Sequence, residues 1–194
     1  MRYPKEHKEQ ARQRLVEGGG RLAKKRGFAS SGVDDLAAAA GVTSGSVYKH
    51  FGGKSELLAA IVAAELARSE ALFAAVPAGD AAQLDKVLKA YLSPKHAKHP
   101  ESGCALPSLT PDIARADAGV RQAFENGLLA VHAALKRHLR SGDAAWALIA
   151  QSVGAVMLAR AMPDDARQRD LLDAITRTAR ETIARSADAR SLAR

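Results

Sequence analysis

Apolar residues recur every three to four positions along most of this chain, which is the spacing of helices that bury one face. The run Leu171, Leu172, Ile175, Ala179 and Ile183 is typical of the pattern. Glycine and proline residues separate the periodic segments, as they do at turns. We therefore predict an all-α fold without strands, in nine helices near residues 7–26, 31–40, 43–50, 54–75, 81–92, 107–111, 120–139, 143–161 and 164–186.

Local signals mark several of these helix ends. Gly27 follows the first helix as a residue that adopts the left-handed conformation easily, and Ser31 with Asp34 three residues later resembles a capping box for the second helix. Gly41 permits a tight turn before Thr43, which can cap the third helix. The stretch 93–103 reads as a loop.

The first helix contains three consecutive glycines, residues 18–20. Each glycine inside a helix costs about 1 kcal/mol relative to alanine. Two interpretations stay open: the triplet allows another helix to approach closely, or it loosens the middle of this helix.

Composition favours packed helices as well, because the chain is rich in alanine and only 4% of it is aromatic. A single cysteine, Cys104, cannot form an internal disulfide framework and fits the reducing cytoplasm. We see no secretion signal and no uninterrupted apolar run of the roughly 20 residues that span a bilayer, so we expect a cytoplasmic protein without a membrane partner.

The net charge of +8 is unevenly distributed. Residues 1–54 carry 11 Lys and Arg against 5 Asp and Glu, whereas residues 55–194 carry 18 against 16. A concentrated positive field suits a polyphosphate partner, since neutralised phosphates release condensed counterions. A solvated basic segment without a partner would have the same composition.

The segment 36–58, LAAAAGVTSGSVYKHFGGKSELL, has the pattern of a helix-turn-helix. A short helix is followed by a turn at Gly41 and by a second short helix that turns Val47 and Phe51 inward. Small and polar residues then face outward, where they can enter the major groove of double-stranded DNA. The residues expected to read bases are Ser44, Gly45, Ser46 and Lys49.

The string from Gly41 to Phe51, GVTSGSVYKHF, followed by Lys54 and Leu57, closely resembles the signature of the tetracycline-repressor (TetR) family. The resemblance implies a three-helix DNA-binding head over 1–53 and a larger helical body over 54–194 for ligand binding and dimerisation. It also implies that Thr43, Tyr48, His50 and Lys54 contact backbone phosphates. The glycine triplet, where alanine is usual, and Ser31, where threonine is common, depart from the family.

The same resemblance implies a homodimer that binds a palindromic operator and a small-molecule inducer of unknown identity. The last two long helices are the expected dimer interface, with Ile149, Val153, Met157, Ile175 and Ala179. Burial of this apolar stripe inside one chain is the alternative. The expected ligand pocket, in which each residue could equally be ordinary core, is lined by Phe73, Cys104, Leu106, Phe124, Leu128, His132 and Trp146.

Cys104 follows a polar loop and precedes a short helix, whose N-terminal N–H groups would favour the reactive thiolate. It resembles a Gly-Cys pair in some TetR-family regulators that respond to electrophiles, so sensing by Cys104 is an alternative, with an inert thiol as the simpler interpretation. His96, His99 and Cys104 match no closed zinc pattern, so we expect no metal site and no cofactor.

The sequence bears on two other classes of function, an enzyme and an architectural DNA-binding protein. The chain contains no GxxxxGK[ST], GxSxG or HExxH motif and no paired carboxylates in a catalytic arrangement, so we expect no enzyme. A basic helical protein could instead coat DNA without sequence preference, which would make it an architectural protein. The favoured hypothesis is a transcriptional repressor that a small molecule releases from its operator.

Overall fold

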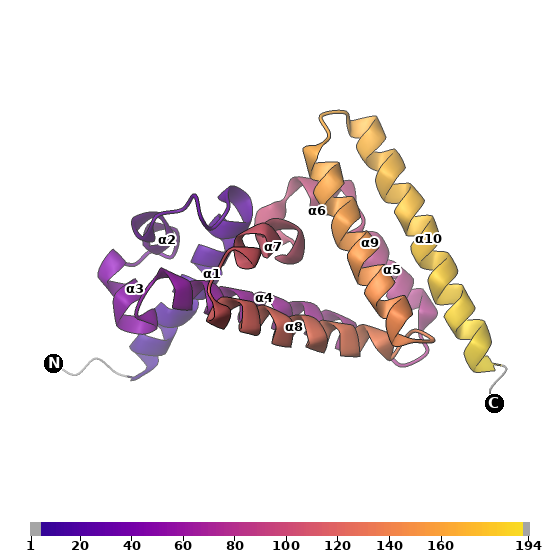
Figure 1. The fold of residues 1–194 in the computed structure, drawn as a ribbon, viewed down its shortest axis with the longest axis horizontal. Coiled ribbons are helices and arrows are strands. Elements are labelled where there is room, and N and C mark those ends of the chain that lie inside the picture. The colour runs from indigo at the N-terminus through magenta and orange to yellow at the C-terminus, as the bar shows by residue number, and fades with distance from the viewer. Residues whose placement is uncertain (1–4, 192–194) are drawn as a thin grey trace. The chain divides into compact units, whose positions relative to one another are not determined.

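The computed structural model describes residues 5–191, and the side chains of residues 7–186. The described residues form helices and no strand, so the predicted all-α class is confirmed (Figure 1). The helices divide into two compact units, each with its own core. The first contains the described residues up to 66 together with 100–127, and the second contains 67–99 and the described residues from 128 onward.

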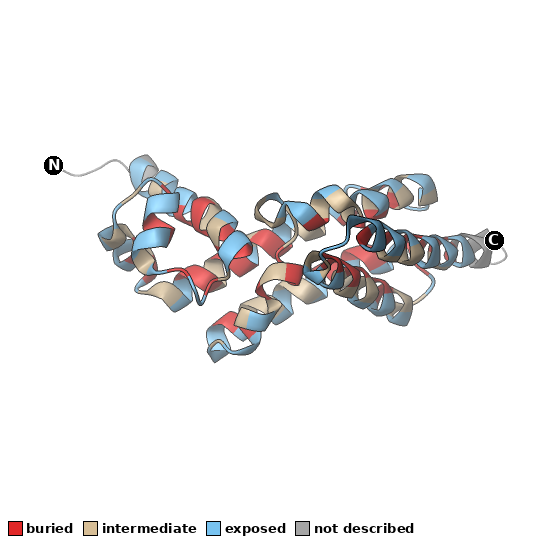
Figure 2. Ribbon diagram, turned by 90° about the horizontal axis from the view of Figure 1, so that it is seen from above, coloured by how far each residue is buried: buried red, intermediate tan, exposed pale blue. Residues whose placement is uncertain are grey.

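The first unit is built around the N-terminal helices. Its buried core includes Leu15, Leu36, Val47, Leu57 and Ile61, each with at most 1% of its surface exposed. Figure 2 shows buried residues in red on the helices. Its elements are α1 (Lys5–Arg26), α2 (Val33–Ala39), α3 (Ser44–Phe51), the first part of α4 (Lys54–Ala74), the 3-10 turn η1 (Pro100–Ser102), α7 (Leu106–Ala114) and the first part of α8 (Ala118–Lys136).

The second unit is a helical bundle in which α10 packs along α9 and α5. Leu84, Leu148 and Leu172 are among its fully buried side chains. Its elements are the remainder of α4 and α8 together with α5 (Ala81–Tyr91), α6 (Pro94–Lys98), α9 (Gly142–Ala161) and α10 (Asp165–Ser191).

All nine predicted helices are present, but the loop predicted over 93–103 is wrong. This stretch contains α6 and η1. The Ser93 hydroxyl caps α6 by accepting the His96 N–H at 3.2 Å, and Pro94 occupies the first turn, where its missing N–H costs nothing. Arg160 of α9 then donates to the Ala97 carbonyl at 3.1 Å, so contacts distant in sequence stabilise a helix too short to be predicted.

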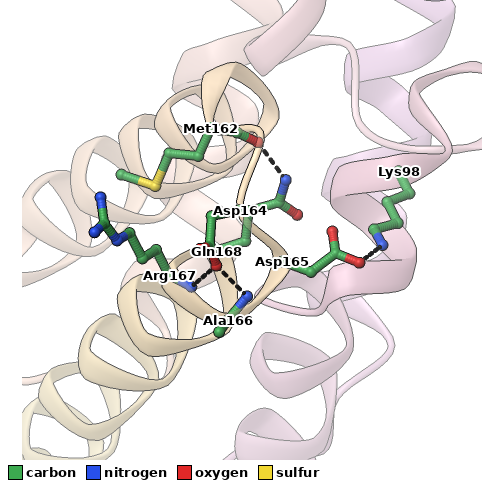
Figure 3. A network of polar contacts seen from close by, with 7 residues as sticks. All are labelled: Lys98, Met162, Asp164, Asp165, Ala166, Arg167 and Gln168. Atoms are coloured by element: carbon green, nitrogen blue, oxygen red, sulfur yellow. Dashed lines mark hydrogen bonds and ion pairs between the residues drawn. The ribbon is translucent and has the colours of Figure 1, made fainter.

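Figure 3 shows how the turn between α9 and α10 is held. One carboxylate oxygen of Asp164 accepts the backbone N–H groups of Ala166 and Arg167, at 2.8 and 3.0 Å, and so caps the start of α10. Lys98 of α6 forms an ion pair with Asp165 at 2.7 Å. The two side chains fix α6 and the first turn of α10 to each other within this unit.

The glycine triplet in α1 marks a close helix approach, which decides between the two interpretations. A Cβ atom at Gly18 would lie 2.5 Å from the Ala39 carbonyl oxygen and 2.7 Å from the Ala40 Cα. At Gly19 the nearest atom is a side-chain carbon of Ile61 at 3.5 Å, an ordinary contact. Gly18 is therefore the glycine that the crossing of α1 and α2 requires.

Among the described residues, α9 is the one helix that is long and apolar enough to cross a membrane by length and composition alone, which the sequence analysis did not expect. Only a third of its most apolar 18-residue window is buried inside the chain. The exposed large side chains of α9 are Trp146, Met157 and Leu158.

Candidate nucleic-acid interface

The helix-turn-helix consists of α2, a tight turn and α3. Gly41 adopts a φ of +66°, in the left-handed region that glycine favours, and its N–H donates to the Ala38 carbonyl at 3.0 Å. The Val42 N–H donates to the Ala37 carbonyl at 3.0 Å. The turn predicted at Gly41 is confirmed.

The predicted capping box of α2 is wrong by one residue. The Ser31 side chain is buried, and its hydroxyl donates to the Gly27 carbonyl at 2.8 Å. The helix instead begins after Gly32, whose N–H donates to the Asp35 carboxylate at 3.0 Å. Asp34 is left outside the cap.

Helix α3 buries Val47 and Phe51, as predicted, and leaves its other side open. Tyr48 is 59% exposed, which is unusual for so large an aromatic side chain. The predicted DNA-contacting residues all have exposed surface: Thr43, Gly45, Tyr48 and Lys49 are exposed, and Ser44, Ser46, His50 and Lys54 are half-buried.

Two hydroxyl contacts shape the start of α3. Thr43 occupies the N-cap position, but its side chain makes no cap bond and lies 3.3 Å from the Ser46 hydroxyl. The Ser44 hydroxyl donates to one carboxylate oxygen of Asp34 in α2. The second contact links the two helices of the motif across ten residues of sequence, and no local pattern predicts it.

Cations surround the far end of α3. Partial burial, followed by Lys8, Lys49 and Arg12, lowers the pKa of His50 from its usual 6.5, while Glu9 opposes them. The Arg12 guanidinium lies 5.0 Å from the centre of the Phe51 ring. Helix α1 thus adds positive charge beside α3. The concentration of Lys and Arg in residues 1–54 indicated such a positive region.

The ammonium group of Lys54 is oriented toward the α1–α2 connection. It lies 3.4 Å from the Ala29 carbonyl oxygen and 4.9 Å from the centre of the Phe28 ring. The predicted phosphate contact of Lys54 therefore requires this side chain to turn outward, and it stays a prediction.

Polar contacts join the segments that flank the helix-turn-helix to residues 100–127 of the same unit. The Asp112 carboxylate accepts the Phe28 N–H at 3.0 Å, and the Asp117 carboxylate accepts the Ser55 hydroxyl. The Lys24 ammonium donates to the Gly103 carbonyl at 2.8 Å. Sequence reasoning missed all three, since their partners are 62 to 84 residues apart.

The predicted pocket residues are divided between the units: Cys104, Leu106 and Phe124 belong to the first, and Phe73, Leu128, His132 and Trp146 to the second. His132 and Trp146 stack with ring centres 4.2 Å apart, and Nε2 of His132 lies 3.0 Å from the Gly142 carbonyl oxygen. The described residues contain no group of three His, Cys, Asp or Glu side chains that could hold a metal ion.

Four of the five predicted interface residues keep exposed surface. Met157 is 37% exposed, and Ile149, Val153 and Ile175 are half-buried. Ala179 is 1% exposed, because its own chain covers it, so it offers a partner no surface.

Residues 15–61 match the profile of the bacterial regulatory proteins of the tetR family. The chain is 39% identical over 62 residues to the HTH-type transcriptional regulator TtgR of Pseudomonas putida, and equally to the probable HTH-type transcriptional regulator ArpR of the same species. Each alignment covers 32% of this chain and 30% of the relative. The chain thus matches under a third of the length of these curated relatives.

Solved structures share the fold over most of the chain. Reduced NemR of E. coli superimposes with a TM-score of 0.72 at 21% identity, covering 87% of this chain and 94% of that one. A TetR-family transcriptional regulator of Cytophaga hutchinsonii gives 0.71 at 20% identity, covering 92% and 95%. Residues 15–61 therefore carry the DNA-binding segment of the tetR family of bacterial regulatory proteins, and the chain as a whole shares the fold of solved TetR-family regulators.

Proposed function

We propose that this protein is a sequence-specific, DNA-binding transcriptional repressor that a small molecule releases from a palindromic operator. The observation that carries the proposal is the open side of α3, where Tyr48 and Lys49 are exposed between two buried anchors, Val47 and Phe51. A helix held in this way can enter the major groove. The family is one of regulators, which agrees with the expectation that the chain is not an enzyme.

The chemistry of the open side divides into two roles. Tyr48, His50 and Thr43 carry hydroxyl and N–H groups that donate to phosphate oxygens, so they would fix the position of the helix on the backbone. The small residues at the start of α3, with Lys49, would reach base edges, because short side chains let the helix backbone approach them.

Binding to DNA fragments from the neighbourhood of the protein's own gene tests the proposal. A specific regulator should bind one palindrome about 10³-fold or more tighter than random DNA of the same length. Tyr48→Ala should weaken binding to specific and random DNA alike. Lys49→Ala should weaken the specific complex, whereas Arg177→Ala, which removes another exposed cation, from α10, should not. Equal affinity for all sequences would favour an architectural protein.

We further propose that two copies pair through the apolar stripe of α9 around Trp146, Val153 and Met157. A palindrome has two half-sites about 34–36 Å apart and requires two DNA-binding heads, whereas one chain contains one. A Cβ at Gly154 would meet nothing within 4 Å, so this side of the helix is open to close approach. Charged residues would make such a helix costly to pair, and residues 144–159 include none.

The mass of the protein in solution tests the pairing. Met157→Arg places a charge on the stripe and should convert the dimer into a monomer that keeps its helical content. Leu72→Arg provides the control, since Leu72 is 51% exposed on α4 and lies outside the stripe. A wild-type monomer at micromolar concentration, or a dimer insensitive to Met157→Arg, would contradict this interface.

Ligand release rests on the family and on the predicted pocket. A ligand shifts the protein between a DNA-binding and a released state only by its differential affinity for the two. A screen of small molecules for loss of operator binding tests it, with cytoplasmic metabolites and antibiotics as the probes. Substitution of His132 or Trp146, two of the predicted pocket residues, which stack on each other in the second unit, should then lower sensitivity to the ligand while leaving operator affinity in its absence unchanged.

Cys104 supports a second candidate signal. Its thiol is half-buried, and the Leu106 N–H lies 3.4 Å from the sulfur. Because Cys104 is the only cysteine, alkylation by N-ethylmaleimide reports on it alone. Loss of operator binding on alkylation, absent in Cys104→Ser, would support a sensor. Complete alkylation with unchanged affinity would contradict it.

A further inference from the structure

We infer that Asp34 is a residue of the DNA-binding head that determines which bases the protein prefers. This inference rests on the proposed function, and it concerns how that function selects bases. Because Asp34 binds the Ser44 proton, the Ser44 hydroxyl can only accept hydrogen bonds from DNA. At the position that Ser44 faces, it therefore selects a base that presents a donor in the major groove, which is cytosine or adenine.

The two neighbouring carboxylates at the start of α2 have different partners. Asp35 accepts the Gly32 N–H at 3.0 Å and so stabilises its own helix. Asp34 is exposed, takes no part in that cap, and instead accepts the Ser44 hydroxyl from the first residue of α3. The contact therefore spans the helix-turn-helix at its DNA-facing side.

The serine hydroxyl has one proton, and that proton is committed to Asp34. The remaining lone pairs of the Ser44 oxygen can only accept, as can the free oxygen of the carboxylate. In the major groove, cytosine presents its N4 amino group and adenine its N6 amino group as donors, whereas guanine N7 and O6 and thymine O4 are acceptors. Guanine and thymine would place an acceptor atom against the Ser44 oxygen, so the Asp34–Ser44 pair disfavours both bases.

The other hydroxyl pair on this surface differs in this respect. Thr43 and Ser46 lie 3.3 Å apart, and either oxygen can be the donor, so one of the two protons is always available to DNA. That pair suits phosphate or an acceptor edge equally. Among the hydroxyls of this segment, Ser44 is the one whose polarity a charged neighbour fixes.

A carboxylate this close to the groove also repels phosphate. It weakens binding to every sequence, and only a donating base at the right position offsets the loss. Discrimination gained through repulsion of the wrong partners is a general route to specificity. Removal of the charge should therefore raise affinity for random DNA while the base preference declines.

Selection of bound sequences from a randomised DNA pool, followed by affinity measurement, tests the inference with the full-length protein. Wild type should prefer cytosine or adenine at one position of each half-site by roughly tenfold. Asp34→Asn, whose amide can itself donate, and Ser44→Ala should each abolish the preference at that same position and leave the others intact. The double variant should show no further change there.

Asp35→Asn is the matched control, since it removes an equal charge from the adjacent residue. It should raise affinity for random DNA as Asp34→Asn does, without altering any base preference. Circular dichroism confirms that each variant is folded. A preference for guanine or thymine at the Ser44 position, or a base preference unchanged by Asp34→Asn, would overturn the inference while the proposed function stands. A wild-type protein that selects no sequence would overturn both.

Discussion

The Lys24 ammonium lies 2.8 Å from the Glu65 carboxylate, and both side chains are at most 5% exposed. The same ammonium donates to the Gly103 carbonyl at 2.8 Å. One buried cation thus joins α1, α4 and the segment before α7 within the first unit. Two buried charges are tolerated here because each compensates the other and further hydrogen bonds satisfy the ammonium.

Removal of one partner of this ion pair should lower the free energy of unfolding far more than replacement of both partners by apolar residues. Glu65→Leu leaves an uncompensated ammonium in the core and should lower the free energy of unfolding by about 3–5 kcal/mol. Lys24→Met removes the cation beside the buried Glu65 carboxylate and should also destabilise the protein. The double variant, which is apolar and similar in volume, should be more stable than either single variant. Urea denaturation followed by circular dichroism measures all three.

The exposed pair of Arg185 and Glu181 provides the comparison, since these side chains are 62% and 69% exposed and 3.9 Å apart. Arg185→Ala should change stability by less than about 1 kcal/mol. Additive losses in the double variant of Lys24 and Glu65 would show that the buried pair contributes no coupling.

Periodicity predicted the helices because it depends on residues three or four apart, and α3 with its buried Val47 and Phe51 is a clear case. Lys24 illustrates what periodicity misses. A charged residue near the end of a basic helix reads as a solvated one, and only its distant partners, Glu65 and Gly103, explain its burial. Contacts of this kind leave no local pattern.

Substitution of the glycine triplet should distinguish its members. Gly18→Ala gains about 1 kcal/mol of helix propensity but forces its Cβ against the backbone of α2, a clash that typically costs about 1–3 kcal/mol and more where backbone must move. We expect a net loss of up to about 2 kcal/mol. Gly19→Ala makes only an ordinary contact with Ile61, so it should stabilise the protein by up to about 1 kcal/mol.

Thermal unfolding of both variants measures the difference. Equal stabilisation by the two alanines would mean that α2 is not packed against Gly18, and would restore the interpretation that the triplet loosens the helix.

Asp112 should rigidify the connection between α1 and α2. Its carboxylate accepts the Phe28 N–H at 3.0 Å, and Asp112→Ala would leave that donor without its charged partner, at a cost of about 1–3 kcal/mol. Amide hydrogen exchange should accelerate at Phe28 in this variant. Arg115→Ala removes only the 70% exposed ion-pair partner of Asp112, 3.7 Å away, and should leave the Phe28 exchange rate unchanged.

The DNA-binding head shows a similar division between what local sequence reveals and what it does not. The turn at Gly41 and the open side of α3 follow from residue types and spacing. The link from Asp34 to Ser44 does not, because a Ser-to-Asp separation of ten residues has no periodic meaning. It arises only once the turn has brought the starts of α2 and α3 together, and the same holds for the direction of Lys54.

Finally, His50 should give DNA binding and stability opposite responses to acid. Partial burial and the cations Lys8, Lys49 and Arg12 hold its pKa below 6.5, so it is neutral at pH 7.5 in the free protein. The unfolded chain then binds a proton at higher pH than the folded one, and the free protein should lose stability as the pH falls through 6.5.

A DNA phosphate beside His50 would favour the protonated ring and raise its pKa. Affinity should therefore increase over the same range, by about tenfold for each pKa unit that the phosphate restores. Melting curves and binding isotherms from pH 7.5 to 5.5 measure both effects. The same measurements on His50→Gln give the contribution of the other histidines, which is subtracted from that of the wild type. An affinity whose pH dependence survives His50→Gln would place His50 away from the phosphates.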